Sequence, residues 1–286
     1  YNHELIRPNE KLPVFVWIHN PAQVGYANYI APHWHQAIEI SYTLAGKIDE
    51  FIVEGKTYQC DPGKILVVNS QEIHSIKVKL PTKDSRALTV IYDYNFIKEL
   101  YPEIKDEWIR INNQQVFTAE QRKVYKELQS LLDGIVKLYN QEENKFKNIE
   151  MSLELLRVLK LLLVNFAIAD QKKRAQTNKT NKQLYSIVEF IKNNYQEISS
   201  LEDVAEYCHL SKEYLARFFK KNMGITVGQY IAEIKAKNAY EQIGVSQKNL
   251  TQIALDAGFS GIRTMDRALI RVYGKKASEI KKVNQS

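Results

Sequence analysis

The sequence predicts an α+β protein in which a small N-terminal β-barrel, a helical segment and a C-terminal all-α domain follow one another. Three observations predict this order. Runs of β-branched and aromatic residues fill residues 14–95, the hydrophobic spacing then becomes helical, and the C-terminal part contains a duplicated helical unit. A chain of 286 residues is long enough to bury more than one hydrophobic core.

The barrel is predicted by closely spaced strands within residues 14–95. The runs VFVWIH, AIEISYTLAG, IDEFIVEG, KILVVN and ALTVIYDY are rich in β-branched and aromatic side chains, and most of them end beside Gly, Asn or Pro. Strands at this spacing are typical of a small barrel or sandwich. We assign residues 1–95 to this domain.

Helical periodicity follows in residues 96–170, which we expect to form a dimerisation segment. The apolar positions of its first helix, expected at about 118–140, are Val124, Leu128, Leu131, Leu132, Ile135 and Leu138. A second helix, at about 149–169, is apolar nearly all round, so one of its faces is expected to meet a second subunit in a homodimer. An intramolecular core is the alternative. Charged residues such as Glu154 and Arg157 argue against a membrane span here.

Residues 171–182 are polar, basic and without periodicity, so we expect a linker there. From Gln171 to Ser286 the chain has 20 Lys and Arg against 11 Asp and Glu, whereas the remainder has 20 against 22. This asymmetry indicates a polyanionic partner for the C-terminal part, although a solvated basic surface has the same composition. Cys60 and Cys208 form no CxxC pair, and the first residues lack the apolar run of a signal peptide, so we expect a cytoplasmic protein.

The duplicated unit lies at 201–224 and 250–274, in the segments LEDVAEYCHLSKEYLARFFKKNMG and LTQIALDAGFSGIRTMDRALIRVYG. Each copy reads as a helix, a tight turn and a second helix, and the second copy has one extra residue in the turn. A helix-turn-helix locks the inner face of its second helix onto the first helix and inserts the outer face into the DNA major groove. The outer positions of the first copy are Lys212, Glu213, Ala216, Arg217 and Lys220. Two such units on one chain could read two grooves about 10 base pairs apart.

Residues 183–286 resemble the double helix-turn-helix domain of the AraC/XylS family of transcription regulators. The resemblance rests on Ala205, Ser211, YLARFFKK and Gly224, and on QYIAEIKAKNA, which is similar to the family's linking helix with Lys235 where Arg is usual. It implies a double-stranded DNA operator and RNA polymerase as partners. In the second copy it implies that Ile262, Arg263, Asp266 and Arg267 face the DNA. This copy departs from the family pattern at Met265, Leu269, Ile270 and Ala277.

The stretch APHWHQAIEISYTLAG, residues 31–46, resembles the first motif of the cupin barrels through His33, His35, Glu39 and Gly46. The second cupin motif is matched by Gly63, Asn69, Gln71 and His74, with Asn and Gln replacing its usual Pro and Gly. Regulators of the AraC family commonly carry such a barrel as a ligand sensor. The resemblance therefore makes residues 1–95 a cupin-like effector-binding domain.

Three imidazoles and one carboxylate could bind Zn²⁺, Mn²⁺ or Fe²⁺. Regulators of this family often keep the same residues for shape and hydrogen bonding, so we expect no metal and no cofactor. Aromatic faces combined with a few polar groups suit a sugar. The residues expected to bind the effector are Trp17, His33, Trp34, His35, Glu39, Tyr42 and His74. A core role for the aromatic residues is the alternative.

Together these features predict a DNA-binding transcription regulator, not an enzyme, that activates a carbohydrate-use operon when a small sugar binds its barrel. A metal-dependent cupin isomerase or dioxygenase with an accessory helical domain is the rival prediction, and the duplicated helix-turn-helix argues against it. A third alternative is a regulator whose barrel binds no small molecule and only dimerises.

Overall fold

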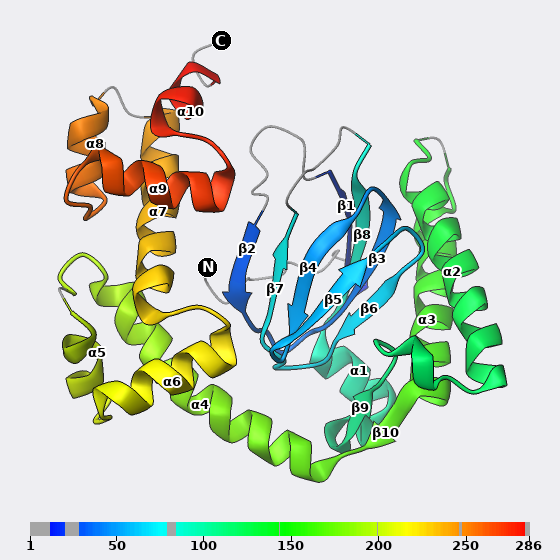
Figure 1. Ribbon diagram of the computed structural model, residues 1–286. Coiled ribbons are helices and arrows are strands. Elements are labelled where there is room, and N and C mark those ends of the chain that lie inside the picture. Colours follow the sequence, from blue (N-terminus) through cyan, green and yellow to red (C-terminus); the bar gives the residue numbers. More distant parts are fainter. Residues whose placement is uncertain are drawn as a thin grey trace.

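The computed structural model describes residues 12–20, 29–78, 84–142, 144–198, 200–245 and 248–283, and its ribbon shows a β-rich half and a helical half (Figure 1). One antiparallel sheet has the order β1 (Val14–His19), β8 (Arg86–Tyr92), β3 (Ile38–Ala45) and β6 (Ile65–Val68). The other has the order β2 (Tyr29–His33), β7 (His74–Lys77), β4 (Ile48–Val53) and β5 (Lys56–Cys60). The expected α+β class is confirmed, and within the described residues the barrel is open, because its strands form two separate sheets.

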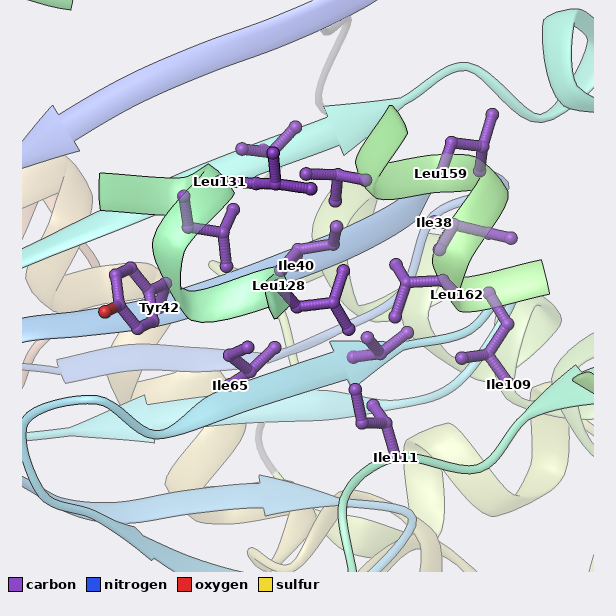
Figure 2. Close-up of a cluster of buried hydrophobic side chains, with 14 of the residues drawn as sticks. Ile38, Ile40, Tyr42, Ile65, Ile109, Ile111, Leu128, Leu131, Leu159 and Leu162 are labelled. Carbon is purple, nitrogen blue, oxygen red and sulfur yellow. The ribbon is translucent and has the colours of Figure 1, made fainter. Parts of the chain in front are cut away.

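The side chains of β3 alternate between the two faces of the first sheet. Ile38, Ile40 and Tyr42 belong to the large apolar cluster that includes residues of two long helices, α2 (Ala119–Tyr139) and α3 (Lys147–Phe166) (Figure 2). The intervening polar residues, Glu39, Ser41 and Thr43, therefore face the second sheet. They are buried as well, so the space between the sheets holds an unusual number of polar groups.

Along the chain, β8 is followed by α1 (Tyr94–Leu100), a 3₁₀ turn (Pro102–Asp106), β9 (Glu107–Ile109) and a second 3₁₀ turn (Gln114–Val116), after which α2 begins. Strand β9 pairs with β10 (Ala167–Ala169), which follows α3. The Thr118 side chain accepts a hydrogen bond from the Gln121 backbone amide, and the Gln121 side chain accepts one from the Thr118 backbone amide, so a capping box starts α2. Leu128 and Leu162 are almost fully buried on the sheet, and each such side chain contributes roughly 1.5–3 kcal/mol by burial. In the part of the chain that the structure describes, no helix has the length and hydrophobicity to cross a bilayer.

The expectation of an irregular linker at residues 171–182 is wrong. These residues form the first half of a continuous helix, α4 (Gln171–Asn194), which joins the two halves of the molecule (Figure 1). The segment contains no Gly or Pro and is rich in Lys, Gln and Asn, so nothing in it interrupts helical hydrogen bonding. Polar composition alone therefore did not distinguish a helix from an irregular linker.

The duplicated unit forms two helix-turn-helix motifs joined by α7 (Val227–Val245). The first consists of α5 (Leu201–Tyr207) and α6 (Lys212–Met223), the second of α8 (Leu250–Asp256) and α9 (Ile262–Tyr273), and α10 (Ala277–Val283) follows. The turn residues His209 and Gly258 both adopt a left-handed conformation, with φ of 53° and 82°. The extra residue of the second copy is Gly261, which directly precedes α9.

Two departures from the family pattern have structural explanations. The Lys235 ammonium donates a hydrogen bond to the carbonyl oxygen of Gly258 at 2.8 Å, so it ties α7 to the turn of the second motif. Ala277, which stands where Pro is usual, has an amide that donates to an Asp266 carboxylate oxygen at 2.9 Å. Proline could not make this bond, because it has no N–H.

Candidate functional site

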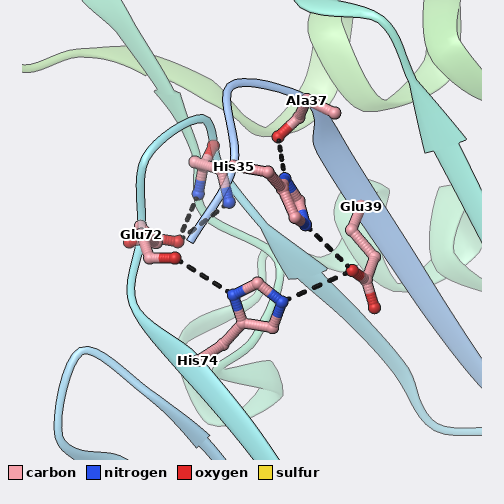
Figure 3. A network of polar contacts seen from close by, with 6 residues as sticks. His35, Ala37, Glu39, Glu72 and His74 are labelled. Atoms are coloured by element: carbon pink, nitrogen blue, oxygen red, sulfur yellow. Dashed lines mark hydrogen bonds and ion pairs between the residues drawn. The ribbon is translucent and has the colours of Figure 1, made fainter. Parts of the chain in front are cut away.

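The four polar residues of the cupin-like motifs meet inside the barrel half. The Glu39 Oε2 atom lies 3.2 Å from Nε2 of His35 and 3.4 Å from Nε2 of His74 (Figure 3). The rings of His33 and His74 are 4.1 Å apart between centroids. His35, Glu39 and His74 are all buried, and His33 is partly exposed. The cluster joins β2, β3, β7 and the segment that connects β2 to β3.

Backbone contacts determine which ring nitrogens carry protons. Nδ1 of His35 lies 3.0 Å from the carbonyl oxygen of Ala37, and Nδ1 of His74 lies 3.0 Å from that of Glu72 (Figure 3). A carbonyl oxygen only accepts, so both Nδ1 atoms donate. Both Nε2 atoms then face the Glu39 carboxylate. A proton on Nε2 of a ring whose Nδ1 already carries one makes that ring an imidazolium, which pairs with the carboxylate.

This pair shifts the titration of its members in opposite directions. Burial alone would raise the pKa of Glu39, but the hydrogen bonds and charges of His35 and His74 hold it well below its usual range. Burial alone would lower the pKa of His74, but the Glu39 carboxylate raises it. His19 is the third titrating group on this side of the sheet, and burial lowers its pKa against an opposing contribution from Glu39.

The pair predicts a pH dependence of stability. The contribution of Glu39 is present above its ordinary pKa of 4.5 and lost as pH falls through its folded pKa. The contribution of His74 is present below its ordinary pKa of 6.5 and lost as pH rises through its folded pKa. We therefore expect the free energy of unfolding in urea to fall as pH rises above about 6.5 and through the raised folded pKa of His74. The fall should be smaller in Glu39→Gln, and an equal fall in both proteins would contradict the pairing.

The loop before β7 is held by a second buried carboxylate, Glu72. Its Oε2 accepts hydrogen bonds from the backbone amide and side-chain amide of Asn69, at 2.9 and 3.1 Å, and its Oε1 accepts one from the Trp108 indole at 2.8 Å. The Asn69 side chain also pairs with the backbone of Ile109 in both directions. Asn69, which replaces the usual Pro of the cupin motif, thus ties this loop to β9 and positions His74.

Gln71 occupies the position of the glycine in the second cupin motif and keeps the backbone shape of that glycine. Its φ is 67°, a left-handed conformation that costs a side-chain-bearing residue roughly 1–2 kcal/mol. Its amide donates to the carbonyl oxygen of His35 at 2.7 Å, which joins the two motifs. Strain of this kind concentrates at functional sites, so Gln71 is itself a candidate.

The donor set matches that of a metal site only in part. One nitrogen from each of His33, His35 and His74 lies within 4.8 Å of the others, and imidazoles together with a carboxylate suit Zn²⁺ or Fe²⁺. However, Glu39 contacts two of these rings directly, where an ion would have to separate them. The carboxylate–imidazolium pair already balances the buried charge, so no ion is needed to neutralise Glu39.

A cleft of about 250 Å³ connects this cluster to the helical half. Its barrel side is lined by Pro32, His33, Trp34, His35, Gln36 and Gln71, and its helical side by Tyr185, Val188, Glu189, Lys192 and Tyr230. Trp34 and Ile73 also pack against the core of the first helix-turn-helix motif. The barrel therefore contacts the DNA-binding half through the same segment that carries the histidines.

The two second helices of the duplicated unit have buried inner faces and exposed outer faces. On α6, Leu215, Phe219 and Met223 are buried, whereas Lys212, Glu213, Arg217 and Lys220 are exposed. On α9, Met265 and Leu269 fill the core in place of the usual aromatic residues, and Arg263 and Arg267 are exposed. Ser211 caps α6 by accepting a hydrogen bond from the Tyr214 amide.

Comparison with known proteins identifies both halves. The model of the AraC-like ligand binding domain matches residues 21–159, and a helix-turn-helix domain model matches residues 204–282. The chain belongs to the AraC family of transcription regulators. It is therefore a DNA-binding transcription regulator with a ligand-binding domain.

Individual AraC-family proteins are similar along most of the chain. The melibiose operon regulatory protein of Escherichia coli is 22% identical over 91% of this chain and 86% of its own length. The transcriptional activator RhaS of Mannheimia succiniciproducens is 20% identical over 88% of this chain and 87% of its own. The crystal structure of ToxT from Vibrio cholerae aligns with a TM-score of 0.40 at 13% identity, over 96% of this chain and 98% of that one.

Three of the expected site residues make contacts within their own half of the molecule. Tyr42 points away from His35, and its hydroxyl donates a hydrogen bond to Asp133 of α2 at 3.0 Å. The alternation of β3 places Tyr42 on the face opposite Glu39, so it is a core residue. Asp266 is engaged by the amide of Ala277, and Ile262 packs against the core of the second motif. Both are partly exposed, so their expected contacts with DNA stay predictions.

Trp17 remains on the inner side of its strand, beside His19, with 5.2 Å between the ring centroids. His19 was missed from the sequence, although it alternates with Trp17 on one face of β1 and period-two spacing could have identified it. Glu72 and Trp108 were missed because they contact each other across 36 positions of sequence. The cleft residues Tyr185, Glu189 and Lys192 carry no motif, and only the packing of α4 on the barrel reveals them.

Proposed function

We propose that this AraC-family protein activates a carbohydrate-use operon when a small neutral sugar binds at the histidine–glutamate cluster. The observation that carries the proposal is the buried polar network of His35, Glu39 and His74, which opens through His33 and Trp34 onto a cleft. Imidazole, carboxylate and amide groups beside an indole match the hydroxyls and C–H faces of a sugar. The similarity to a melibiose operon regulator and to the activator RhaS supports the same class of function.

The DNA contacts are proposed for the exposed outer faces of α6 and α9. We retain Lys212, Glu213, Ala216, Arg217 and Lys220 in the first motif, and Arg263 and Arg267 in the second. Arginine can grip a guanine edge bidentately, whereas lysine neutralises phosphates. We propose RNA polymerase as a further partner of the activator. Because this partner and the operator DNA are in the bacterial cytoplasm, we propose that the protein is cytoplasmic.

For the organisation of the chain we propose an effector-binding barrel in residues 1–95, a dimerisation segment in 96–170 and a DNA-binding domain in 183–286, with 171–182 as their helical connection. The dimer proposal rests on a stripe of exposed apolar residues along α3. The stripe consists of Ile149, Leu153, Leu156 and Val164, which follow each other at helical spacing. A second copy of the chain would cover it.

Leu153→Lys is expected to convert the dimer to a monomer, because it places a charge in the centre of this stripe. Sedimentation equilibrium measures the change, and operator affinity should fall with it, since two linked chains bind a two-part operator more tightly. Leu100→Lys is the matched control, because Leu100 of α1 is exposed to the same extent, 58%, outside the stripe. A Leu153→Lys protein that sediments like wild type would contradict this interface.

The sugar proposal is tested by a thermal-shift screen of the full chain with named mono- and disaccharides. A sugar that binds only the folded protein raises the unfolding midpoint. A gel shift with the DNA upstream of the gene that encodes this protein, with and without the stabilising sugar, then tests whether sugar binding changes DNA binding. Absence of any stabilising sugar would overturn the sugar class, and absence of salt-sensitive DNA binding would overturn the reading-helix assignment.

A further inference from the structure

The cleft beside the histidine cluster has walls from both halves of the chain. Trp34 and Gln71 line it from the barrel, and Tyr185, Glu189 and Lys192 line it from α4. A molecule in this cleft would therefore touch the DNA-binding half directly. At about 250 Å³ the cleft lies below the ~300–1,000 Å³ of pockets for drug-sized ligands, so it suits a small molecule.

The chemistry of the α4 wall complements that of the barrel wall. The barrel supplies an indole, two imidazoles and two carboxamides, whereas the helical side adds the Tyr185 and Tyr230 hydroxyls, one carboxylate and one ammonium group. Glu189 and Lys192 carry opposite charges on the same side of α4, so a strongly charged ligand would meet one like charge. A neutral polyhydroxylated molecule can form hydrogen bonds with both Glu189 and Lys192, because each of its hydroxyls donates and accepts.

The helical wall is connected to the first reading helix through one layer of side chains. Val188 lines the cleft and is also buried in the cluster that contains Leu215 and Phe219 of α6. Gly55, in the turn between β4 and β5, approaches the carbonyl oxygen of Lys221 near the end of α6. The barrel is therefore linked to α6 through the side-chain cluster that includes Val188, and its β4–β5 turn lies near the end of α6.

We propose that one sugar molecule in this cleft is bound by both halves of the chain at once. Trp34 and Gln71 contact it from the barrel, and Tyr185 and Lys192 contact it from α4. Bound sugar then fixes the barrel against the first helix-turn-helix motif, and the DNA-binding half takes part in choosing the effector. This inference rests on the proposed sugar-responsive function.

The experiment uses the full chain and a panel of D-galactose, L-rhamnose, L-arabinose, melibiose and maltose. The sugar that stabilises wild type is titrated by calorimetry into Tyr185→Phe and Lys192→Gln, and into Glu39→Gln as the barrel variant. Tyr139→Phe and Lys126→Gln on α2 are the matched controls. Each α4 variant is expected to bind the sugar about tenfold more weakly, which is the effect of one lost hydrogen bond. The unfolding midpoint of Tyr185→Phe without sugar should equal that of wild type, because Tyr185 is largely exposed.

The outcomes separate this inference from the function on which it rests. Loss of affinity in both the α4 variants and Glu39→Gln, with unchanged controls, supports two-sided binding. Wild-type affinity in Tyr185→Phe and Lys192→Gln, with loss only in Glu39→Gln, overturns it and leaves a sugar site confined to the barrel. Failure of every sugar to stabilise wild type overturns the proposed function, and two-sided sugar binding with it.

Discussion

Arg217→Ala is expected to weaken operator binding by about 1–3 kcal/mol, or roughly 5–150-fold, while the protein stays folded. Arg217 lies on the exposed side of α6, opposite the buried Leu215 and Phe219. Its side chain is therefore available for a guanine edge or a phosphate without disturbing the core. Lys212, on the same helix, already pairs with Glu202, so its removal should cost less.

The measurement is a salt series of operator titrations, with circular dichroism as the check on folding. Loss of a phosphate contact lowers the salt dependence by about one ion and weakens binding to all sequences alike, whereas loss of a base contact relaxes specificity at one position. Arg122→Ala, at an exposed position of α2, is the matched control. Wild-type operator affinity in a folded Arg217→Ala protein would remove this residue from the reading face.

Glu39→Gln is expected to abolish most of the effector response and to leave effector-free DNA binding nearly intact. Glutamine keeps the size of the side chain but removes the charge that pairs with His35 and His74. The pKa of His74 is then no longer raised by Glu39, so the ring loses its proton near neutral pH and the network changes its donors and acceptors. Sugar affinity should fall about tenfold or more, because Glu39 holds His35, which lines the cleft, through a charge-assisted contact.

The test combines sugar titration with metal analysis of the purified protein. Glu120→Gln is the control, since Glu120 is an exposed residue of α2. A chelator should change neither sugar binding nor DNA binding. Purified protein that holds about one equivalent of Zn, Mn or Fe, lost together with the response in Glu39→Gln, would establish the metal site instead.

Periodicity and local motifs were sufficient wherever a structural feature depends on neighbouring residues. The alternation of the strands, the helical spacing of α2 and α3, and the repeated helix–turn–helix pattern all arise from contacts between residues a few positions apart. The grouping of His33, His35, Glu39 and His74 could be predicted because the spacing matched a known motif. Such features can be predicted directly from the order of residues.

Features that depend on long-range packing could not be read in this way. Tyr42 looked like a ligand-binding aromatic residue, but α2 supplies Asp133 for its hydroxyl and turns it into a core residue. The polar segment 171–182 carried no sign of tertiary contact, yet it continues into the helix whose later turns close the cleft against Trp34. The sequence by itself therefore determined the duplicated helix-turn-helix pattern and the histidine cluster, and its resemblance to known regulators indicated the family. Only the tertiary structure decided which side chains share a cavity, because distant segments meet through packing that leaves no local pattern in the sequence.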